Sequence, residues 1–324
     1  MSGRLLSDPS QRRWLIRVAG SVVVLAILFW LLPAEAIVTA LKSIPIWVFL
    51  FVLALFLLAH VGAALKWWLL LNRGLPPLLA IRAHFAGLAA NLCLPGAIGG
   101  DTVRAGLAQA AMKDGAQVVA GATVDRLIDM VALLTLSCLG LVLTWESAAG
   151  GYMIWPVALI LLAALAGMVA MPRLLPLPWR YIPSLPGKGF AHRLAEALAG
   201  MGRKPGTLAI AFVASILIQL VLVLLAWWLA IAAGVDVTAG PWIFAWPLAK
   251  IIAVLPVSLN GLGLREATLA GFLAPFGASA PAVVAAGLVW QVVLFTAGGL
   301  GALVLTLSGM RFSAPANSQK EECK

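Results

Sequence analysis

The chain has 324 residues, of which 63% are hydrophobic and 10% are charged. Soluble domains carry about 25% charged residues, so this composition excludes an ordinary soluble protein and predicts an all-α polytopic membrane protein. The net charge of +10 is typical of basic cytoplasmic loops, and no basic stretch interleaved with aromatic residues indicates a nucleic-acid partner.

The first apolar segment follows a basic N-terminus and ends at Leu32, before the sequence PAEA. This arrangement resembles a signal peptide with a small-residue cleavage site. We expect instead an uncleaved first span at 16–32, with residues 1–15 in the cytoplasm.

Six apolar segments are long enough to cross a hydrocarbon core of about 30 Å. These predicted spans are 16–32, 44–71, 118–144, 153–171, 206–233 and 282–307. They define one membrane domain at 16–310, which contains a basic cytoplasmic loop at 172–204 and precedes a polar C-terminal tail at 311–324.

Two further apolar stretches are interrupted. The first, from about 80 to 113, contains NLCLPGAIGGDTVRAG (91–106), and the second, from about 241 to 276, contains LPVSLNGLGLRE (255–266). Each half gives about 20–24 Å of helix, which is too short to cross the core. The stretches are therefore either re-entrant hairpins or long kinked spans. Re-entry places most of the 22 basic residues toward the cytoplasm, whereas a crossing by the first stretch turns the loop 172–204 outward, so we expect re-entrant hairpins.

Paired tryptophans mark an internal repeat, since WWLLLNRG at 67–74 matches WWLAIAAG at 227–234. In both broken stretches, a Leu-Pro pair then precedes an arginine at the same spacing. Three full spans separate the starts of the two units, and an odd number of crossings inverts the second unit. Inverted repeats with broken helices at the membrane centre are typical of secondary transporters. We predict an inverted repeat with units of about 44–145 and 206–307.

Each break places the start of a half-helix inside the membrane. Asp101 is an N-cap candidate for the first half-helix, and Asn260 lies near the start of the second. Free N–H groups at these starts, together with Arg104 and Arg265, suit an anionic group such as a lipid phosphate. In the alternative interpretation, Arg104 pairs with Asp101 and Arg265 with Glu266, simply to satisfy buried charges.

The sequence DRLID lies in the first turns of the third predicted span. Asp125 and Asp129 are four residues apart and share one helix face. The pattern leaves three functional interpretations open: the two carboxylates pair with Arg104 or Lys66, they carry protons, or they hold an amino headgroup. The alternative is an interfacial anchor in which Arg126 extends to water.

Two lysines occur within apolar segments. Lys66 is near the end of its span and is expected to extend to water, whereas Lys250 has less reach to water and is the better site candidate. The substrate-binding candidates are Asp101, Arg104, Lys250, Asn260, Arg265 and Glu266. The gating or coupling candidates are Asp125, Arg126, Asp129 and Lys66.

No enzyme motif is complete. His60, His84 and His192 are too separated in sequence to suggest a metal site, the three cysteines are scattered, and no P-loop lysine follows the glycines. Gly121-x3-Asp125-x3-Asp129 matches the second half of the CDP-alcohol phosphotransferase motif, but the first half is missing. We therefore expect no enzyme activity, metal or cofactor.

Three segments together resemble the hallmarks of the lysylphosphatidylglycerol synthase transmembrane-region family: NLCLPGAIGGDTVRAG, VDRLIDMVALL and LPVSLNGLGLREA. The resemblance covers roughly 10 to 310 and implies a flippase-like, lipid-handling membrane domain. The family usually has Glu-Arg where this chain has Asp125-Arg126. Bifunctional members carry a soluble synthase domain after the membrane region, and since a polar tail follows here, aminoacyl transfer is not implied.

We predict a transporter that moves a lipid with an anionic or zwitterionic headgroup across the bacterial inner membrane, with both termini in the cytoplasm. The substrate classes are phospholipids, polyprenyl-phosphate-linked lipids, and hopanoids or glycolipids. Lipid-biosynthesis enzymes are candidate partners, and the pattern leaves the oligomeric state open. Two alternatives remain: a membrane-embedded transferase of lipid headgroups or prenyl phosphate, and a non-catalytic scaffold for lipid biosynthesis.

Overall fold

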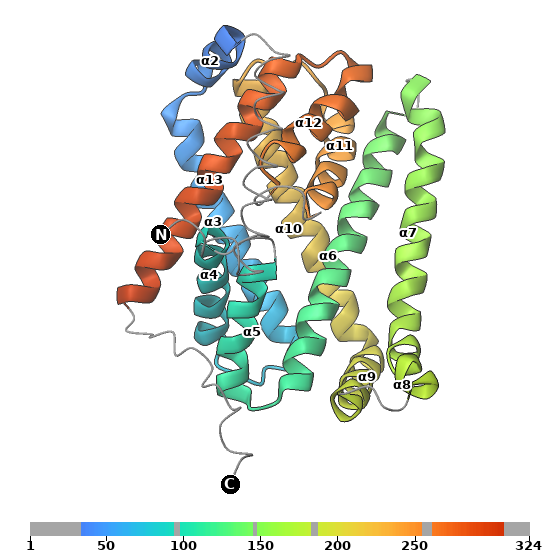
Figure 1. The fold of residues 1–324 in the computed structure, drawn as a ribbon. Coiled ribbons are helices and arrows are strands. Elements are labelled where there is room, and N and C mark those ends of the chain that lie inside the picture. Colours follow the sequence, from blue (N-terminus) through green and yellow to red (C-terminus); the bar gives the residue numbers. More distant parts are fainter. Residues whose placement is uncertain (1–33, 94–97, 145–147, 183–186, 255–260, 308–324) are drawn as a thin grey trace, which may run out of the picture.

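The computed structural model describes residues 34–93, 98–144, 148–182, 187–254 and 261–307. These residues form helices and connecting turns, without strands, so the all-α fold class is confirmed (Figure 1). The predicted first span at 16–32, the tail at 311–324 and Asn260 lie outside the described residues.

Five helices in the described part of the chain are long and apolar enough to cross a membrane, and they correspond to five of the predicted spans. They are α3 (Ile46–Leu70), α6 (Gly115–Leu143), α7 (Ala148–Leu174), α10 (Pro205–Ala232) and α13 (Ala280–Leu307).

The outer surfaces of these helices are apolar. Leu58 on α3, Leu162 on α7 and Leu217 on α10 are each more than half exposed. Such surfaces are stable against lipid tails, and the helices satisfy their own backbone hydrogen bonds. The chain is therefore a multi-pass membrane protein.

The two broken stretches form two helical hairpins. The first consists of α4 (Pro77–Cys93) and α5 (Ile98–Met112), and the second of α11 (Ala239–Ile252) and α12 (Leu264–Leu273), followed by the 3-10 helix η2 (Ala274–Phe276). Figure 1 shows the hairpins in opposite halves of the bundle. The helices of each pair pack against one another, so neither stretch is one kinked helix. Re-entry into a bilayer stays a prediction.

Helices of each unit pack on helices of the other unit. The first hairpin packs through α4 on α13, the second packs through α11 on α6, and α3 packs on α10. A Cβ added at Gly140 of α6 would lie 2.3 Å from the Phe244 nitrogen, and one at Gly301 of α13 would lie 2.6 Å from the Phe85 oxygen. These two glycines are 161 positions apart, as are Arg104 and Arg265. The reciprocal packing supports the repeat inferred from the sequence.

The basic segment predicted as a loop at 172–204 is mostly helical. It contains α8 (Leu177–Tyr181) and α9 (Lys188–Gly202), and α9 packs on α6 and α7. Helix α9 folds there because Ala191, Leu198 and Met201 place a buried apolar stripe on one side. A further helix, α2 (Ala34–Ser43), packs on α13 at the other end of the bundle (Figure 1).

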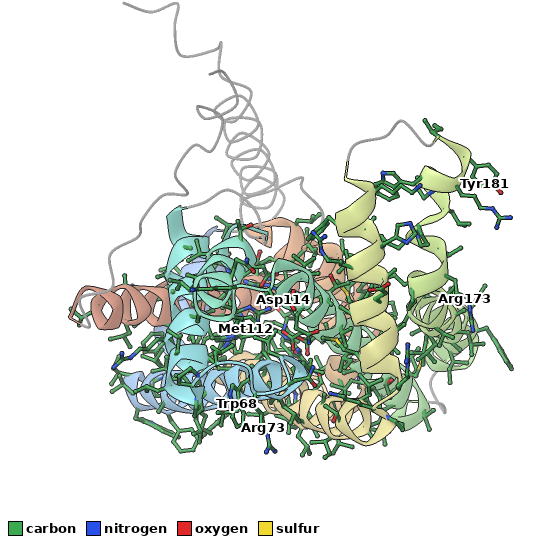
Figure 2. The ribbon with its side chains drawn as sticks, turned by 90° about the horizontal axis from the view of Figure 1, so that it is seen from below. Trp68, Arg73, Met112, Asp114, Arg173 and Tyr181 are labelled. Atoms are coloured by element: carbon green, nitrogen blue, oxygen red, sulfur yellow. The ribbon has the colours of Figure 1, made fainter. Side chains whose placement is uncertain are left out.

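One end of the bundle collects basic side chains. Figure 2 views this end, where Arg73 lies after α3 and Arg173 near the end of α7. Lys204 donates a hydrogen bond to the Asn72 side chain at 2.8 Å, which joins the α9–α10 turn to the α3–α4 turn. By the positive-inside tendency the sequence predicts that this end faces the cytoplasm, and this orientation stays a prediction.

Candidate functional site

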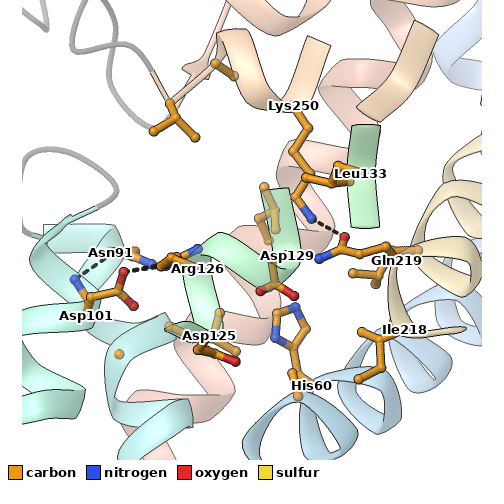
Figure 3. Close-up of a pocket in the computed structure, with 18 of the residues that line it drawn as sticks. His60, Asn91, Asp101, Asp125, Arg126, Asp129, Leu133, Ile218, Gln219 and Lys250 are labelled. Atoms are coloured by element: carbon orange, nitrogen blue, oxygen red, sulfur yellow. Dashed lines mark hydrogen bonds and ion pairs between the residues drawn. The ribbon is translucent and has the colours of Figure 1, made fainter. Parts of the chain in front are cut away.

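A cavity with charged side chains in its wall lies between the two hairpins (Figure 3). Its wall includes residues of α3, α4, α5, α6, α10, α11, α12 and α13, so every helix of both repeat units contributes. The cavity encloses about 260 Å³. Pockets that bury a whole drug-sized ligand measure about 300–1,000 Å³. This cavity is therefore slightly smaller than such pockets and suits a small polar group.

Seven of the ten predicted site residues line the cavity. They are Asp101, Arg104, Asp125, Arg126, Asp129, Lys250 and Arg265. Lys66 and Glu266 lie behind the wall, each bound to a residue that lines it.

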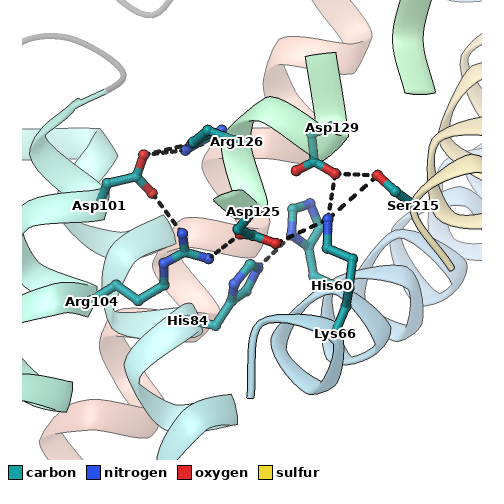
Figure 4. A network of polar contacts seen from close by, with 9 residues as sticks. All are labelled: His60, Lys66, His84, Asp101, Arg104, Asp125, Arg126, Asp129 and Ser215. Atoms are coloured by element: carbon teal, nitrogen blue, oxygen red, sulfur yellow. Dashed lines mark hydrogen bonds and ion pairs between the residues drawn. The ribbon is translucent and has the colours of Figure 1, made fainter. Parts of the chain in front are cut away.

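Lys66 is buried in the bundle, so the prediction that it extends to water is wrong. Its side chain is 2% exposed, and its Nζ lies 3.0 Å from Asp125 Oδ1. It also donates to the Asp129 carboxylate, which the Ser215 hydroxyl of α10 contacts as well (Figure 4). Two carboxylates on one face of α6 thus compensate the charge of Lys66 inside the protein.

Asp101 bridges two arginines and does not cap α5. The helix begins at Ile98, so Gly99 and Gly100 continue it and Asp101 is its fourth residue. One carboxylate oxygen lies 3.3 Å from Arg104 Nη2, and the other accepts a hydrogen bond of 2.6 Å from Arg126 Nε. The predicted N-cap role is therefore wrong, because the helix begins at Ile98 and an N-cap at Asp101 would have started it four residues later.

Arg104 connects α5 to α6 in the wall of the cavity. Its Nη1 donates to Asp125 Oδ2 at 3.1 Å, and its guanidinium lies 4.4 Å from the centre of the Trp67 ring. Its Nε is buried without a hydrogen-bond partner among the described residues. Such an orphaned donor is costly, and an acceptor that enters the cavity relieves the cost. Arg104 is thus both ion-paired and able to bind a further acceptor.

The arginine of the second unit, Arg265, is held through its Nε and Nη2 groups, and Nε donates to Glu266 Oε1 at 3.1 Å. Arg265 Nη2 donates to Glu266 Oε1 at 2.6 Å, to the Gly287 carbonyl at 3.1 Å and to Gln291 Oε1 at 3.3 Å. The other Glu266 oxygen accepts the Gly263 N–H at 2.7 Å, where α12 begins. The pairing of Arg265 with Glu266, left open by the sequence, is what the structure contains.

Lys250 differs from the other cations of the cavity. Its Nζ donates to the Gln219 side-chain oxygen at 2.8 Å (Figure 3). Among the described residues, no carboxylate lies within ion-pair distance of it, whereas Arg104, Arg126 and Arg265 each have one. Lys250 is therefore the cation that most lacks a counter-charge.

A histidine pair forms part of the cavity wall. His60 Nδ1 and His84 Nε2 lie 2.9 Å apart, so one ring nitrogen donates to the other (Figure 4). The sequence analysis did not anticipate this contact, because His60 and His84 are 24 positions apart in the chain. Counting residues from the α3–α4 turn in both directions would have placed the two histidines at a similar distance from the turn along their antiparallel helices. No group of three metal-binding side chains occurs among the described residues, so this pair does not indicate a metal site.

Two comparisons with known proteins bear on this arrangement. The model of the family described as the lysylphosphatidylglycerol synthase TM region matches residues 14–301. No curated protein matches the chain.

Proposed function

Because the chain belongs to the lysylphosphatidylglycerol synthase transmembrane-region family, we propose that it is a flippase-like transporter. It moves a lipid with an anionic or zwitterionic headgroup across the bacterial inner membrane. The observation that carries the proposal is the charged cavity between the two hairpins, which residues of both repeat units line.

The charges of the cavity fit a headgroup with a phosphate. Lys250 and the orphaned Nε of Arg104 supply donors from opposite repeat units. A phosphate oxygen that accepts from both gains charge-assisted hydrogen bonds, each worth about 1.5–3 kcal/mol. Asp129, on the same wall, offers a carboxylate to the amine of a zwitterionic headgroup.

The position of the cavity supports alternating access. The hairpins occupy opposite halves of the bundle, and each packs on the last helix of the other unit. Movement of one hairpin opens the cavity toward one side, and movement of the other opens it toward the opposite side. The acyl chains stay in the surrounding lipid, since the volume of the cavity accommodates a headgroup only.

The ion network of the first unit is the candidate gate. It joins α3, α5, α6 and α10 through Lys66, Arg104, Asp125, Asp129 and Ser215. An entering headgroup competes for Arg104 and so weakens the link between α5 and α6. Binding and opening are then coupled through one set of charges.

The test is lipid movement by the purified protein in proteoliposomes. Phosphatidylglycerol, phosphatidylethanolamine and a polyprenyl phosphate, each with a fluorescent tail, are followed by quenching from outside. We expect Lys250→Met to lower the initial rate about tenfold, since tenfold corresponds to about 1.4 kcal/mol and one charge-assisted bond is lost.

Lys42→Met is the matched control, because Lys42 is exposed on α2, away from the cavity. Its rate should equal that of the unmodified protein. If the unmodified protein moves no lipid under gradients of either sign, the transport proposal is wrong and a headgroup transferase or a scaffold replaces it.

A further inference from the structure

The histidine pair has no role in the transport scheme, although both rings line the cavity. Each ring packs on an aromatic side chain: His60 lies 4.3 Å from the Phe56 ring centre and His84 lies 6.2 Å from the Phe85 ring centre. His84 Nδ1 is buried without a hydrogen-bond partner among the described residues. A hydrogen-bonded pair of imidazoles with an unsatisfied nitrogen is chemically suited to accept a proton.

The charged groups around the pair come from several helices. Those that line the cavity or lie directly behind its wall are Lys66 on α3, Asp101 and Arg104 on α5, Asp125, Arg126 and Asp129 on α6, Lys250 on α11, and Arg265 and Glu266 on α12. The facing residues of α10 and α13, Gln219 and Trp290, are neutral.

These groups comprise five cations and four anions, so the empty cavity already carries an excess of positive charge. A proton on the histidine pair adds a second positive charge in a site with little water, which is unfavourable. An anionic headgroup at Lys250 removes this excess and makes the proton acceptable. Asp129, beside the His60 ring in Figure 3, stabilises the charged pair further.

We propose that the His60–His84 pair is a proton-binding site whose occupation is coupled to entry of an anionic headgroup. The proton adds to a free ring nitrogen of the pair, and no other bond forms or breaks. The inference rests on the proposed function, because it requires a lipid headgroup in the cavity. By reciprocity, the proton and the headgroup raise each other's affinity by the same factor.

Binding of short-chain lipids to the purified protein in detergent tests this coupling. Dihexanoyl phosphatidylglycerol should bind about tenfold more tightly at pH 6 than at pH 8, which equals about 1.4 kcal/mol of coupling. Dihexanoyl phosphatidylcholine, whose net charge is zero, should show no such dependence. In the double variant His60→Asn and His84→Gln, whose amides take the positions of the paired ring nitrogens, phosphatidylglycerol should bind equally at both pH values.

His192→Gln is the matched control, because His192 is exposed on α9 and outside the cavity. It should retain the full pH dependence. Phosphatidylglycerol binding that is independent of pH in the unmodified protein would overturn the coupling and leave transport intact. Absence of binding and movement of every lipid would instead overturn the proposed function, and the coupling with it.

A second measurement does not require altering the pair. The chain has three histidines, so nitrogen-15 labelling of histidine in the His192→Gln variant leaves ring signals from two residues, both in the cavity wall. Addition of dihexanoyl phosphatidylglycerol at pH 7 should shift these signals toward the imidazolium form. Unchanged signals at saturating lipid would contradict the proposal.

Discussion

The two repeat units place an arginine at equivalent positions but surround it differently. Arg104 shares its charge between Asp101 on its own helix and Asp125 on α6. Arg265 is held by the neighbouring Glu266 and by two groups of α13, the Gly287 carbonyl and the Gln291 side chain. At the positions equivalent to Asp125 and Asp129, 161 residues later, α13 has alanine and tryptophan. The packing is similar in the two predicted units, whereas the ion pairs that join different helices among the described residues occur in the first unit.

This difference indicates which unit has to break ion pairs when its helices move. The second unit closes its ion pair within one turn of α12, and Arg265 also donates to the Gly287 carbonyl and to Gln291, which joins α12 to α13. The first unit spreads its charges over several helices, so any movement of α5 against α6 must break and remake ion pairs. We therefore assign gating to the first unit, and we describe α12 and α13 of the second unit as a fixed wall, because they stay joined to one another when the second hairpin moves.

The largest expected effect comes from breaking the Arg265–Glu266 ion pair of the second unit. Glu266→Gln leaves the Arg265 charge buried without a carboxylate, because Glu266 is fully buried and no other acid is paired with Arg265 among the described residues. Breaking a buried pair in this way costs about 3–5 kcal/mol. Thermal unfolding in detergent should show a large loss of stability. Glu196→Gln, at an exposed site on α9, serves as the control and should change little. Equal stability of the two variants would refute the fixed-wall assignment.

A smaller loss of stability, equal in the two units, is expected from changing the glycines that allow helices of one unit to pack closely on helices of the other. In Gly140→Ala and Gly301→Ala, the new methyl group meets backbone atoms of the opposite hairpin. Overpacking of this kind costs about 1–3 kcal/mol. Gly167 on α7 has nothing within 4 Å, so Gly167→Ala should be neutral or stabilising by about 0.5–1 kcal/mol. Loss of stability in one unit alone would argue against a repeated scaffold.

The smallest effect concerns binding. Arg104→Gln removes the guanidinium whose Nε is free to bind an acceptor, and should weaken phosphatidylglycerol binding about tenfold, since one charge-assisted bond is lost. The matched change Arg265→Gln should alter affinity per folded molecule less, because the Nε and Nη2 donors of Arg265 are already engaged. Binding is compared at equal folded fraction by titration with dihexanoyl phosphatidylglycerol. A greater loss of affinity in Arg265→Gln would reverse the roles of the two units.

The sequence predicted the helices better than it predicted their contacts. Long apolar runs and the two breaks that contain proline and glycine determine where helices begin and end, because these signals are local. The break before α5 is an instructive exception: Gly99 and Gly100 signal a turn, yet they are helical because Gly100 packs closely on α4. Its N–H also donates to the Asn91 side chain at 2.8 Å.

The site residues were predicted by type, and the sequence named several of their partners without choosing among them: Asp125 with Arg104 or Lys66, Arg104 with Asp101, and Arg265 with Glu266. A lysine near a span end extends to water or turns inward, depending on the helices beside it. Lys66 turns inward because Asp125 and Asp129 of α6 face it, which nothing within α3 indicates. The histidine pair was missed for the same reason, since it forms only when α3 and α4 pack together.

The central claim is that a lipid headgroup enters the cavity between the hairpins, and photo-crosslinking tests it most directly. Phosphatidylglycerol with a photoreactive group on its glycerol headgroup is irradiated with the protein in nanodiscs, and the modified residues are mapped by mass spectrometry. The account predicts labelling of cavity residues such as Leu133, Ile218 and Leu222, with at least a several-fold loss in Lys250→Met. Labelling confined to outward-facing residues such as Leu162 and Leu217, with no change in that variant, would contradict it.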